Sequence, residues 1–396
     1  MSFMDKKKML GHFILTISLF MAASVLSDAF VNIYLWRLRA DYLPITMYML
    51  ACYATVPVVF YLCGYIGMKI DRTAIYIIGI FCYVAFYFMV LIFREHITDH
   101  VLLWGFIKGL AMGFYWFGYH ILTFDFTTTH DRDSFYANTS IISGACSLAG
   151  PMLAGFIITA FPSFSGYYII FACSAVLFIS SAVLSYSMKS TPIKKAYKIE
   201  DLIFSSDVKW RDTMIAYFFL SGRDAISIFL ISILVFKSTG NEFTLGKYSM
   251  IVALATVSTA YILGKFSRPS TRDGFVLTGA VISFLMSFLL IYRINIYTLL
   301  AYGIIGAVAD YLVRIPISAH ALDVISLDAN ASERKMEYIV ARDVPVAMGR
   351  ISMLAVFVMF LRYMPASGIK AIILLISAFP FGVYFFMRNK KNADKK

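Results

Sequence analysis

Charged side chains stand deep inside apolar segments of this sequence, where each one costs at least ~2.5–3.5 kcal/mol on insertion scales. The carboxylates are Asp28, Asp224 and Asp310, and the cations are Lys108, Arg223, Arg314 and Arg350. Charges in such places face a protein interior or a water-filled path, and they serve as proton relays or as partners of a charged solute. The residue types therefore predict proton or ion-pair chemistry inside a membrane.

Asp28 belongs to a polar stripe. Ser24, Asp28 and Asn32 recur at i, i+4 and i+8, which places them on one helix face. No cation stands at i±3 or i±4 from Asp28, and a carboxylate alone in hydrocarbon favours its protonated form. We predict Asp28 as the main proton carrier, Asp224 and Asp310 as further candidates, and Asn32 as a cavity residue. A structural, hydrogen-bonding Asp28 is the alternative.

Two arginines stand close to the other carboxylates. Arg223 precedes Asp224, and Arg314 follows Asp310 by four residues, the spacing of an intrahelical ion pair. Arg223 either points to a neighbouring helix or extends its stem toward the membrane edge. We predict that Arg223 or Arg314 competes for a carboxylate and expels its proton, and that Asp28 and Asp224 confront each other across a central cavity.

Lys108 lies in an aromatic run, with Tyr115 and Tyr119 on the same predicted face. A cation among aromatic rings suits an amphipathic ligand with a negative group, although packing between helices explains the rings equally well. Arg350 is a candidate to hold an anionic group through two hydrogen bonds. Four deep cations against three carboxylates favour an anionic or zwitterionic solute.

Arg342 and Asp343 come near the start of another apolar segment, which makes that segment unusually charged. Neighbouring charges at the mouth of a cavity can form and break salt bridges as the mouth opens. We predict Arg342 and Asp343 as a cytoplasmic gate.

The elements that position these residues are long apolar segments. Of 396 residues, 60% are hydrophobic and only 15% are charged, too apolar for a soluble domain. Twelve segments can cross a bilayer as helices, and their continuous apolar character excludes a β-barrel. They span residues 12–36, 44–68, 73–93, 101–122, 137–160, 167–188, 213–236, 244–265, 274–292, 295–321, 338–361 and 368–387. We predict an all-α polytopic membrane protein.

The chain divides into two similar halves. We predict a six-helix bundle over 1–188, a cytoplasmic loop over 189–212, and a second six-helix bundle with a basic cytoplasmic tail over 213–396. Matching residues recur at a nearly constant offset, as in parallel repeats; the pairs are Asp28 and Asp224, His120 and His320, and Tyr136 and Tyr338.

Charge in the connections predicts the orientation. The loop over 189–212 and the C-terminal tail are rich in Lys and Arg, whereas the connection 162–166 has neither. The positive-inside rule then places both termini in the cytoplasm, in a cell membrane that we expect to be the bacterial inner membrane. The net charge of +12 follows from this bias and does not indicate nucleic-acid binding. The five cysteines form no CxxC pair, and we expect no metal, no cofactor and a monomer.

The segment GYIGMKIDR, residues 64–72, carries a resemblance to a known family. Gly67, Asp71 and Arg72 resemble the Gly-x-x-x-Asp-Arg signature of the major facilitator superfamily, although the residues that follow depart from it. The resemblance implies twelve helices in two bundles, braced by this loop on the cytoplasmic face. Asp71 would then stand at a helix N-terminus, where an anion is favoured.

A second motif indicates the direction of transport. Gly150, Pro151 and Gly155 in AGPMLAG resemble the Gly-Pro motif of the family's antiporters. Proline bends a helix and glycine permits close helix contact. The motif implies exchange of a solute against an ion and favours export.

These features together predict a secondary transporter that works by alternating access. No GxxxxGK[ST] phosphate loop occurs, so the energy comes from a gradient, and the carboxylates favour protons. We expect export of a small amphipathic anionic or zwitterionic molecule, with protons and membrane lipids as the other partners. Three alternatives stay open: a flippase for a lipid or lipid-linked glycan, proton-coupled uptake, and a transporter-like receptor or interaction protein. Without HExxH or GxSxG, an enzyme is not expected.

Overall fold

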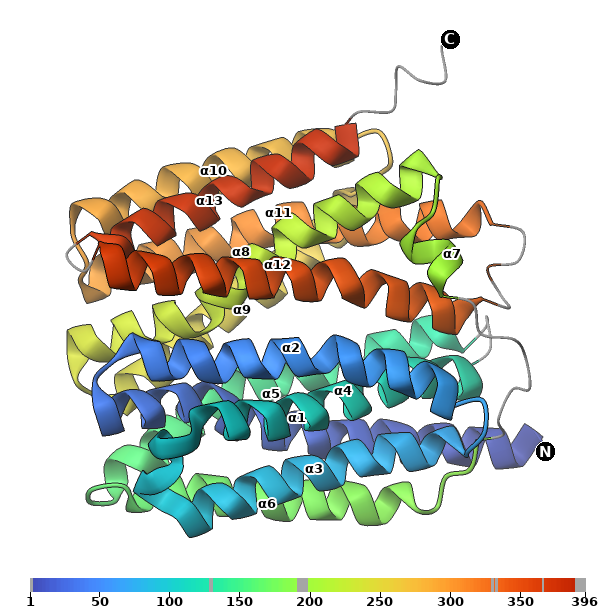
Figure 1. Ribbon diagram of the computed structural model, residues 1–396, viewed down its shortest axis with the longest axis horizontal. Helices are drawn as coiled ribbons and strands as arrows, with labels where there is room; N and C mark the ends of the chain where they lie inside the picture. Colours follow the sequence, from blue (N-terminus) through green and yellow to red (C-terminus); the bar gives the residue numbers. More distant parts are fainter. Residues whose placement is uncertain are drawn as a thin grey trace. The chain divides into compact units, whose positions relative to one another are not determined.

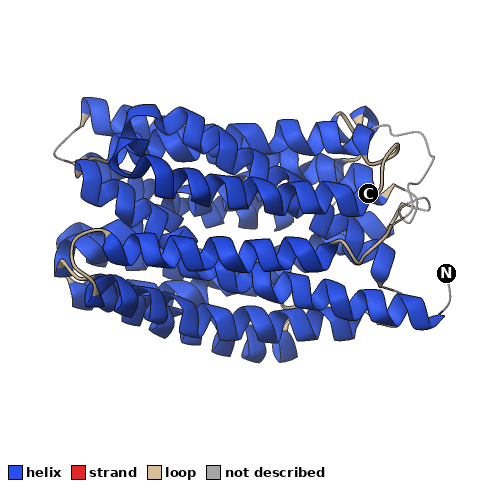
Figure 2. Ribbon diagram, turned by 90° about the horizontal axis from the view of Figure 1, so that it is seen from below, coloured by secondary structure: helices blue, strands red, loops and turns tan. Residues whose placement is uncertain are grey.

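The computed structural model describes residues 3–127, 131–190, 199–328, 331, 334–364 and 367–388. Within these residues the chain is helical and contains no strand (Figure 2). The predicted all-α fold is therefore confirmed. Part of the predicted loop, 191–198, and the basic tail, 389–396, lie outside the described residues.

Twelve helices of 21 residues or more occur in the described part of the chain (Figure 1). The first six are α1 (Phe3–Arg39), α2 (Tyr42–Ile66), α3 (Arg72–Phe93), α4 (Val101–Phe126), α5 (Arg132–Ala160) and α6 (Ser165–Ser185). The second six are α8 (Val208–Thr239), α9 (Glu242–Phe266), α10 (Arg272–Tyr292), α11 (Ile296–Ser326), α12 (Lys335–Tyr363) and α13 (Gly368–Arg388). All are long and apolar enough to cross a membrane, with α3 and α4 joined by the 3-10 helix η1 (Arg94–His100) into one apolar stretch.

The chain forms two compact units. Unit 1 comprises residues 1–197 and 241–250, and unit 2 comprises residues 198–240 and 251–396. Unit 1 thus contains the first part of α9 in addition to α1–α6. In unit 1, α1 packs on α5 and α6, and α3 packs on α4 and α6; in unit 2, α8 packs on α12 and α13, and α10 packs on α11 and α13. The same pairings recur in the two units, as a structural repeat requires.

The predicted loop over 189–212 is shorter in the structure. A one-turn helix, α7 (Glu200–Ile203), precedes α8, which begins at Val208. Trp210 is buried, its indole N–H donates to the Leu202 carbonyl at 2.9 Å, and its ring meets that of Tyr338 edge-on. A buried indole needs such a partner, so these contacts extend the helix into the predicted loop.

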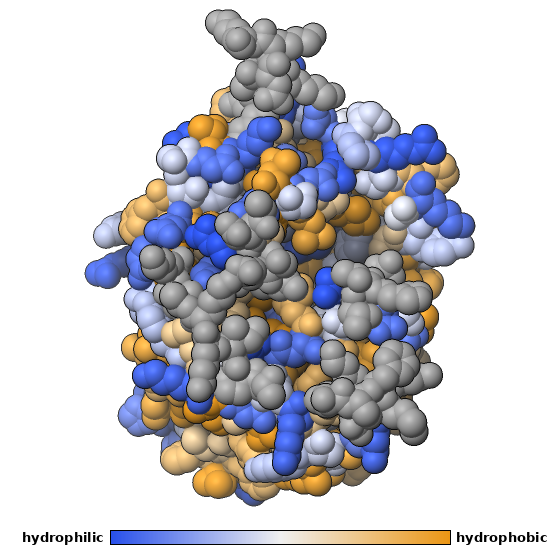
Figure 3. All heavy atoms as spheres, turned by 90° about the vertical axis from the view of Figure 1, so that its right-hand side faces the viewer, coloured by the Kyte–Doolittle hydropathy of each residue, from blue (hydrophilic) through white to orange (hydrophobic). Residues whose placement is uncertain are grey.

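One end of the helices carries hydrophilic side chains among apolar ones. Figure 3 looks along the helices at the end that carries α7 and shows hydrophilic side chains between apolar ones. Elsewhere large apolar side chains are exposed along the helices, such as Ile92 at 70% and Val176 at 61%. Apolar flanks with polar ends are what a bilayer requires of helices.

Candidate functional site

Asp28 in unit 1 has a partner that its own helix does not supply. Its Oδ1 accepts a hydrogen bond from Lys108 Nζ of α4 at 2.6 Å and another from the Tyr87 hydroxyl of α3 at 2.7 Å. Ser27 in turn donates to the Tyr87 oxygen at 2.7 Å. The sequence-based picture of a lone carboxylate is therefore wrong, because the compensating cation comes from another helix.

The Lys108 ammonium is enclosed. It lies 4.3 Å from the centre of the Tyr83 ring and 5.2 Å from those of Phe86 and Tyr87, which adds cation–π attraction to the ion pair. The Lys108 side chain is 8% exposed, whereas that of Asp28 is 41% exposed. The accessible member of the pair is thus the carboxylate, and the charge of Lys108 is compensated by Asp28 and the surrounding rings.

The polar stripe on α1 offers further hydrogen-bonding capacity. The Ser24 hydroxyl and the side-chain amide oxygen of Asn32 are buried and have no hydrogen-bond partner in the described part of the chain. Both hydrogen bonds to the Asp28 side chain reach Oδ1, which leaves Oδ2 free of donors from described residues. Because an unsatisfied buried polar atom costs about 1–3 kcal/mol, this stripe is suited to a ligand that brings donors.

Tyr115 and Tyr119, predicted to line a cavity with Lys108, lie inside unit 1. Tyr115 is fully buried and its ring stacks on that of Phe20 with centroids 3.3 Å apart. Tyr119 is 9% exposed and contacts the ring of Phe13. The face of α4 that carries them packs against α1 and α3, so the aromatic residues serve the bundle core.

In unit 2, two arginines and two aspartates form one cluster. Arg314 Nη2 donates to Asp224 Oδ2 at 2.8 Å, and Arg314 Nε donates to Asp310 Oδ2 at 3.0 Å. Arg223 Nη2 donates to Asp310 Oδ1 and lies 3.3 Å from Asp224 Oδ1. The expectation that Arg223 points to a neighbouring helix is therefore confirmed, and the Asp310–Arg314 pair is part of a larger, charge-balanced network.

The cluster in unit 2 differs in accessibility from the pair in unit 1. The side chains of Arg223, Asp224 and Asp310 are 12%, 16% and 20% exposed, and that of Arg314 is 38% exposed. Unit 2 thus presents mainly a guanidinium, where unit 1 presents a carboxylate.

A close helix crossing positions the cluster. A Cβ on Gly349 of α12 would collide with the Phe218 carbonyl of α8, and one on Gly222 would press on the Gly349 carbonyl oxygen. Only residues without a side chain permit this approach. The crossing fixes the stretch of α8 that carries Arg223 and Asp224.

The other predicted residues of α12 lie outside this cluster. Arg350 follows Gly349 and is partly buried. The Arg342 guanidinium lies 5.9 Å from the centre of the Tyr217 ring, and one carboxylate oxygen of Asp343 is buried without a hydrogen-bond partner among the described residues. Arg342 and Asp343 as gate residues stay a prediction.

The signature loop forms a polar cluster at one end of unit 1. Gly67 ends α2, and the Asp71 carboxylate caps α3 by accepting from the Thr73 N–H at 2.9 Å. Arg72 is 2% exposed and donates to both carboxylate oxygens of Asp125, at 2.7 and 2.9 Å. The expected place of Asp71 at a helix N-terminus is confirmed.

Ser190 connects the two acids of this cluster. Its hydroxyl donates to Asp125 Oδ2 at 2.6 Å, and its backbone N–H donates to Asp71 Oδ1 at 3.1 Å. Ser190 follows α6, so the cluster links the start of α3 to the ends of α4 and α6.

The Gly-Pro motif lies at close helix contacts within unit 1. A Cβ on Gly150 would press on the Val25 side chain of α1, and one on Gly155 would collide with the Glu242 carbonyl at the start of α9. Pro151 lies inside α5, and a Cβ on Gly246 of α9 would collide with the Pro151 carbonyl oxygen. The motif thus allows both α1 and the first part of α9 to approach α5.

Glu242 joins this contact through its side chain. Its Oε1 accepts from Arg37 Nη1 and from the Tyr167 hydroxyl, both at 2.9 Å, and the side chain is 8% exposed. The Arg37 guanidinium also lies 5.0 Å from the centre of the Phe164 ring. The first turn of α9 is therefore held on α1 and α6 by a charged, largely buried hydrogen-bond group.

Sequence reasoning missed Tyr87, Asp125 and Glu242. Asp125 and Glu242 lie at or beyond the ends of the predicted spans, where charges are expected and attract no attention. Tyr87 is one of 26 tyrosines, and nothing in its neighbours distinguishes it. Among the described residues, no group of three or more His, Cys, Asp or Glu side chains could hold a metal ion.

Comparison with known proteins agrees with the fold and the motifs. The family model of the Major Facilitator Superfamily matches residues 9–332. The chain is 30% identical over 388 residues to the "Uncharacterized protein YqgE" of Bacillus subtilis (strain 168), covering 97% of this chain and 90% of that protein.

Solved structures share the fold at low identity. A bacterial homologue of the human lysosomal transporter Spinster, in an inward-facing and unoccupied conformation, has a TM-score of 0.67 and 11% identity, covering 100% of this chain and 99% of that one. A bacterial homologue of the iron transporter ferroportin, in an outward-facing state, has a TM-score of 0.66 and 15% identity, covering 97% and 98%. The chain therefore belongs to the Major Facilitator Superfamily, as a multi-pass membrane transporter rather than an enzyme.

Proposed function

We propose that the chain is a proton-coupled antiporter that exports a small amphipathic molecule with a donor-bearing cationic group and an anionic group. The transporter class follows from the family; the coupling, the direction and the zwitterionic substrate are the proposal. The bacterial cell membrane and cytoplasmic termini, expected from the charge of the loops, belong to the same proposal.

The observation that carries the proposal is the unequal accessibility of the Asp28–Lys108 pair. Asp28 is 41% exposed and keeps Oδ2 free of donors from described residues, while Lys108 is 8% exposed and enclosed by rings. A ligand that approaches this pair meets the carboxylate first. The group that binds there best is an ammonium or another strong donor.

Competition at Asp28 then determines the sign of coupling. A ligand ammonium binds the ionised carboxylate, and a proton neutralises that carboxylate, so each excludes the other. Mutual exclusion at one site is the requirement for antiport. Had Lys108 been the accessible member, protonation of Asp28 would free the ammonium for an anion, and proton and solute would bind together, as in symport.

Unit 2 supports a zwitterionic substrate over a purely anionic one. Six of the seven deep charges pair within their own unit: Asp28 with Lys108 in unit 1, and two aspartates with two arginines in unit 2. Arg314 is the most exposed cation of these pairs and remains as a partner for a carboxylate. The two units thus expose charges of opposite sign, so an ammonium and a carboxylate of a substrate each have a complementary group in the chain.

Three probes with a common aromatic frame test the proposal: phenethylamine, phenylalanine and phenylpropionate. We expect phenylalanine to raise the unfolding temperature of the purified protein most, phenethylamine less and phenylpropionate least. In proteoliposomes that hold a pH-sensitive dye, outward solute movement should drive protons inward. Stabilisation by phenylpropionate alone, or protons moving with the solute, would contradict the proposal.

A further inference from the structure

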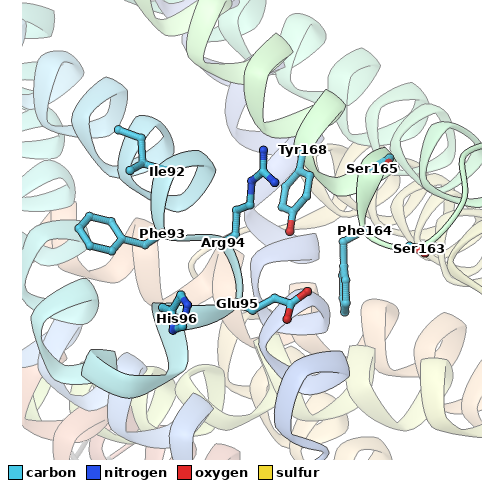
Figure 4. Close-up of a pocket in the computed structure, with 9 residues that line it drawn as sticks. All are labelled: Ile92, Phe93, Arg94, Glu95, His96, Ser163, Phe164, Ser165 and Tyr168. Carbon is cyan, nitrogen blue, oxygen red and sulfur yellow. The ribbon is translucent and has the colours of Figure 1, made fainter.

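A cavity of about 360 Å³ lies in unit 1 at the end of α3 opposite the Asp71–Arg72 loop. The last turn of α3, the start of η1 and the connection before α6 form its walls (Figure 4). Its size falls within the range of small-ligand sites, about 300–1,000 Å³. No step of the proposed transport reaction uses this cavity.

Opposite charges converge on this cavity. Figure 4 shows the Arg94 guanidinium pointing toward Tyr168, with the Glu95 carboxylate and the Tyr168 hydroxyl directed into the same space. The guanidinium lies 5.2 Å from the centre of the Tyr168 ring. Among the residues that the structure describes, neither Arg94 nor Glu95 forms an ion pair, and both are exposed, so both charges are accessible to a ligand in the cavity.

The backbone around the cavity is held in an unusual conformation. Arg94 and Ser163 have φ values of 48° and 55°, and in the described part of the chain Ala40 alone among other non-glycine residues has a positive φ. Each such residue costs on the order of 1–3 kcal/mol and persists where the surroundings require it. Both face this cavity from its two walls, which is consistent with a built site.

The cavity also lies at the level where a lipid headgroup is expected. Ile92 and Phe93, in the last turn of α3, are 70% and 48% exposed, and the Phe93 ring contacts that of Trp104. At this point the exposed apolar residues of α3 give way to the polar residues of η1, the change expected where a membrane-spanning helix reaches the headgroups. A ligand in the cavity would have a place for an acyl chain directly beside the charged pair.

We propose that this cavity binds the headgroup of a phospholipid that carries both a phosphate and a primary ammonium, of the phosphatidylethanolamine class. Arg94 would hold the phosphate, as guanidinium groups do through two parallel hydrogen bonds. Glu95 and the Tyr168 oxygen would accept from the ammonium. A phosphatidylglycerol headgroup offers no cation to Glu95, and a choline headgroup has no N–H to donate, so each of these headgroups satisfies only part of the site.

Native mass spectrometry of the purified full chain tests the site, with titrations of phosphatidylethanolamine, phosphatidylcholine and phosphatidylglycerol of the same acyl chains. We expect wild type to retain phosphatidylethanolamine best. Arg94→Gln should lower retention of all three lipids by about two- to fivefold, the size expected for a partly exposed charge pair. Glu95→Gln should lower the retention of phosphatidylethanolamine to that of phosphatidylglycerol and leave the retention of phosphatidylglycerol similar.

Arg39→Gln is the matched control, because Arg39 lies at the same end of unit 1 and pairs with Asp99 at 2.7 Å outside the cavity. This variant should keep the wild-type preference. The site assignment is overturned if the three lipids bind equally to wild type, or if Arg39→Gln has the same effect as Arg94→Gln. Competition by free O-phosphoethanolamine at the same concentration as the lipid would identify a soluble ligand and overturn the lipid proposal.

Discussion

The two oxygens of Asp28 have different environments, and this difference determines what the residue can do. Oδ1 accepts hydrogen bonds from both Lys108 and Tyr87, which fixes the carboxylate in place. Oδ2 is left for a proton or a ligand donor. One residue can therefore hold the internal ion pair and exchange an external partner.

Replacing Asp28 by asparagine should remove the coupling to protons and weaken transport. The amide in the Asp28→Asn variant would still donate and accept hydrogen bonds but would carry neither a titratable proton nor a charge for a ligand ammonium, so accumulation driven by a pH gradient should be lost and solute exchange at equal pH should be slower and free of proton movement. Proteoliposome uptake with and without a pH gradient measures both. Full gradient-driven transport by Asp28→Asn would return Asp28 to a structural role.

The same substitution leaves Lys108 without its counter-ion, and a control is needed for that effect. We expect Asp28→Asn to lower the free energy of unfolding by about 1–3 kcal/mol, less than for a fully buried pair because Asp28 is partly exposed. The double variant Asp28→Asn, Lys108→Met removes both charges and should recover most of that loss. Equal instability of the single and double variants would show that the ion pair is not the cause.

The sequence identified most of the charged residues but not their partners. Asp28, Lys108, Arg223, Asp224 and Asp310 stood out because a charge in an apolar run is costly wherever its partner is. Which charges meet depends on helix packing: Lys108 is 80 positions from Asp28. The pairing inside α11 was readable only because i, i+4 spacing is a local property.

Within the unit 2 cluster, Asp310 should be the more important acid for stability. It accepts three hydrogen bonds from the two arginines, whereas Asp224 accepts one at 2.8 Å and one at 3.3 Å. We expect Asp310→Asn to cost about 1.5–3 kcal/mol and Asp224→Asn about half of that, measured by thermal unfolding. Asp224→Asn should also impair both gradient-driven transport and exchange.

Asp323→Asn is a suitable control for this pair of variants. Asp323 pairs with Arg272 but its side chain is 60% exposed, so its loss should cost less than about 1 kcal/mol. A cost for Asp310→Asn no larger than that of Asp323→Asn would remove the argument for a tightly held cluster.

At the scale of elements, the twelve spans were predictable because the apolar length required by a bilayer is a property of local sequence. The residues at which the helices begin and end were harder to predict. α8 begins earlier than predicted because Trp210 packs on Tyr338 and donates to Leu202, contacts that no local pattern announces. Likewise α4 continues through Asp125, whose charge is compensated by Arg72 from another helix.

The cap of α3 provides a test of the signature loop. Asn is nearly as good a cap as Asp, so Asp71→Asn should keep α3 intact while weakening the contact to the Ser190 N–H. We expect solute exchange to slow by about two- to tenfold, the equivalent of one hydrogen bond, with little change in binding affinity. Equilibrium binding beside flux decides this, and a large loss of affinity with normal flux would contradict the role of the loop.

The start of α9 provides a second test at this scale. Glu242 is largely buried and Arg37 is 32% exposed, so their coupling in a double-mutant cycle of Glu242→Gln and Arg37→Gln should be about 0.5–1.5 kcal/mol in unfolding free energy. Arg39→Gln serves as the control because its pair with Asp99 is exposed on both sides. No measurable coupling would mean that packing at Gly155 alone holds α9 to α5.

At the scale of the whole molecule, the parallel repeat accounts for the distribution of charge. Asp28 and Asp224 occupy matching places in α1 and α8, and each is compensated by cations from the fourth helix of its own half, α4 or α11. The sequence indicated this repeat through the constant offset of matching residues. It could not indicate that the accessible charge is negative in one half and positive in the other, because exposure depends on how each bundle packs.

Membrane orientation remains a prediction from loop charge, and cysteine labelling tests it. Ser165 lies at the start of α6 and is exposed, so Ser165→Cys should react with an impermeant thiol reagent from outside the cell. Ser190, in the predicted cytoplasmic loop, is unsuitable because it is 8% exposed and bonded to Asp125. Ser206, exposed between α7 and α8, takes its place, and Ser206→Cys should react only in inverted vesicles.

The wild-type protein measures the background labelling in this experiment. Two of its five cysteines, Cys52 and Cys63, are buried, and the other three are in helices that we expect to lie within the bilayer. Positions 165 and 206 lie on either side of a single span, α6, so reaction of both from the same side would exclude the proposed crossing and with it the twelve-span topology.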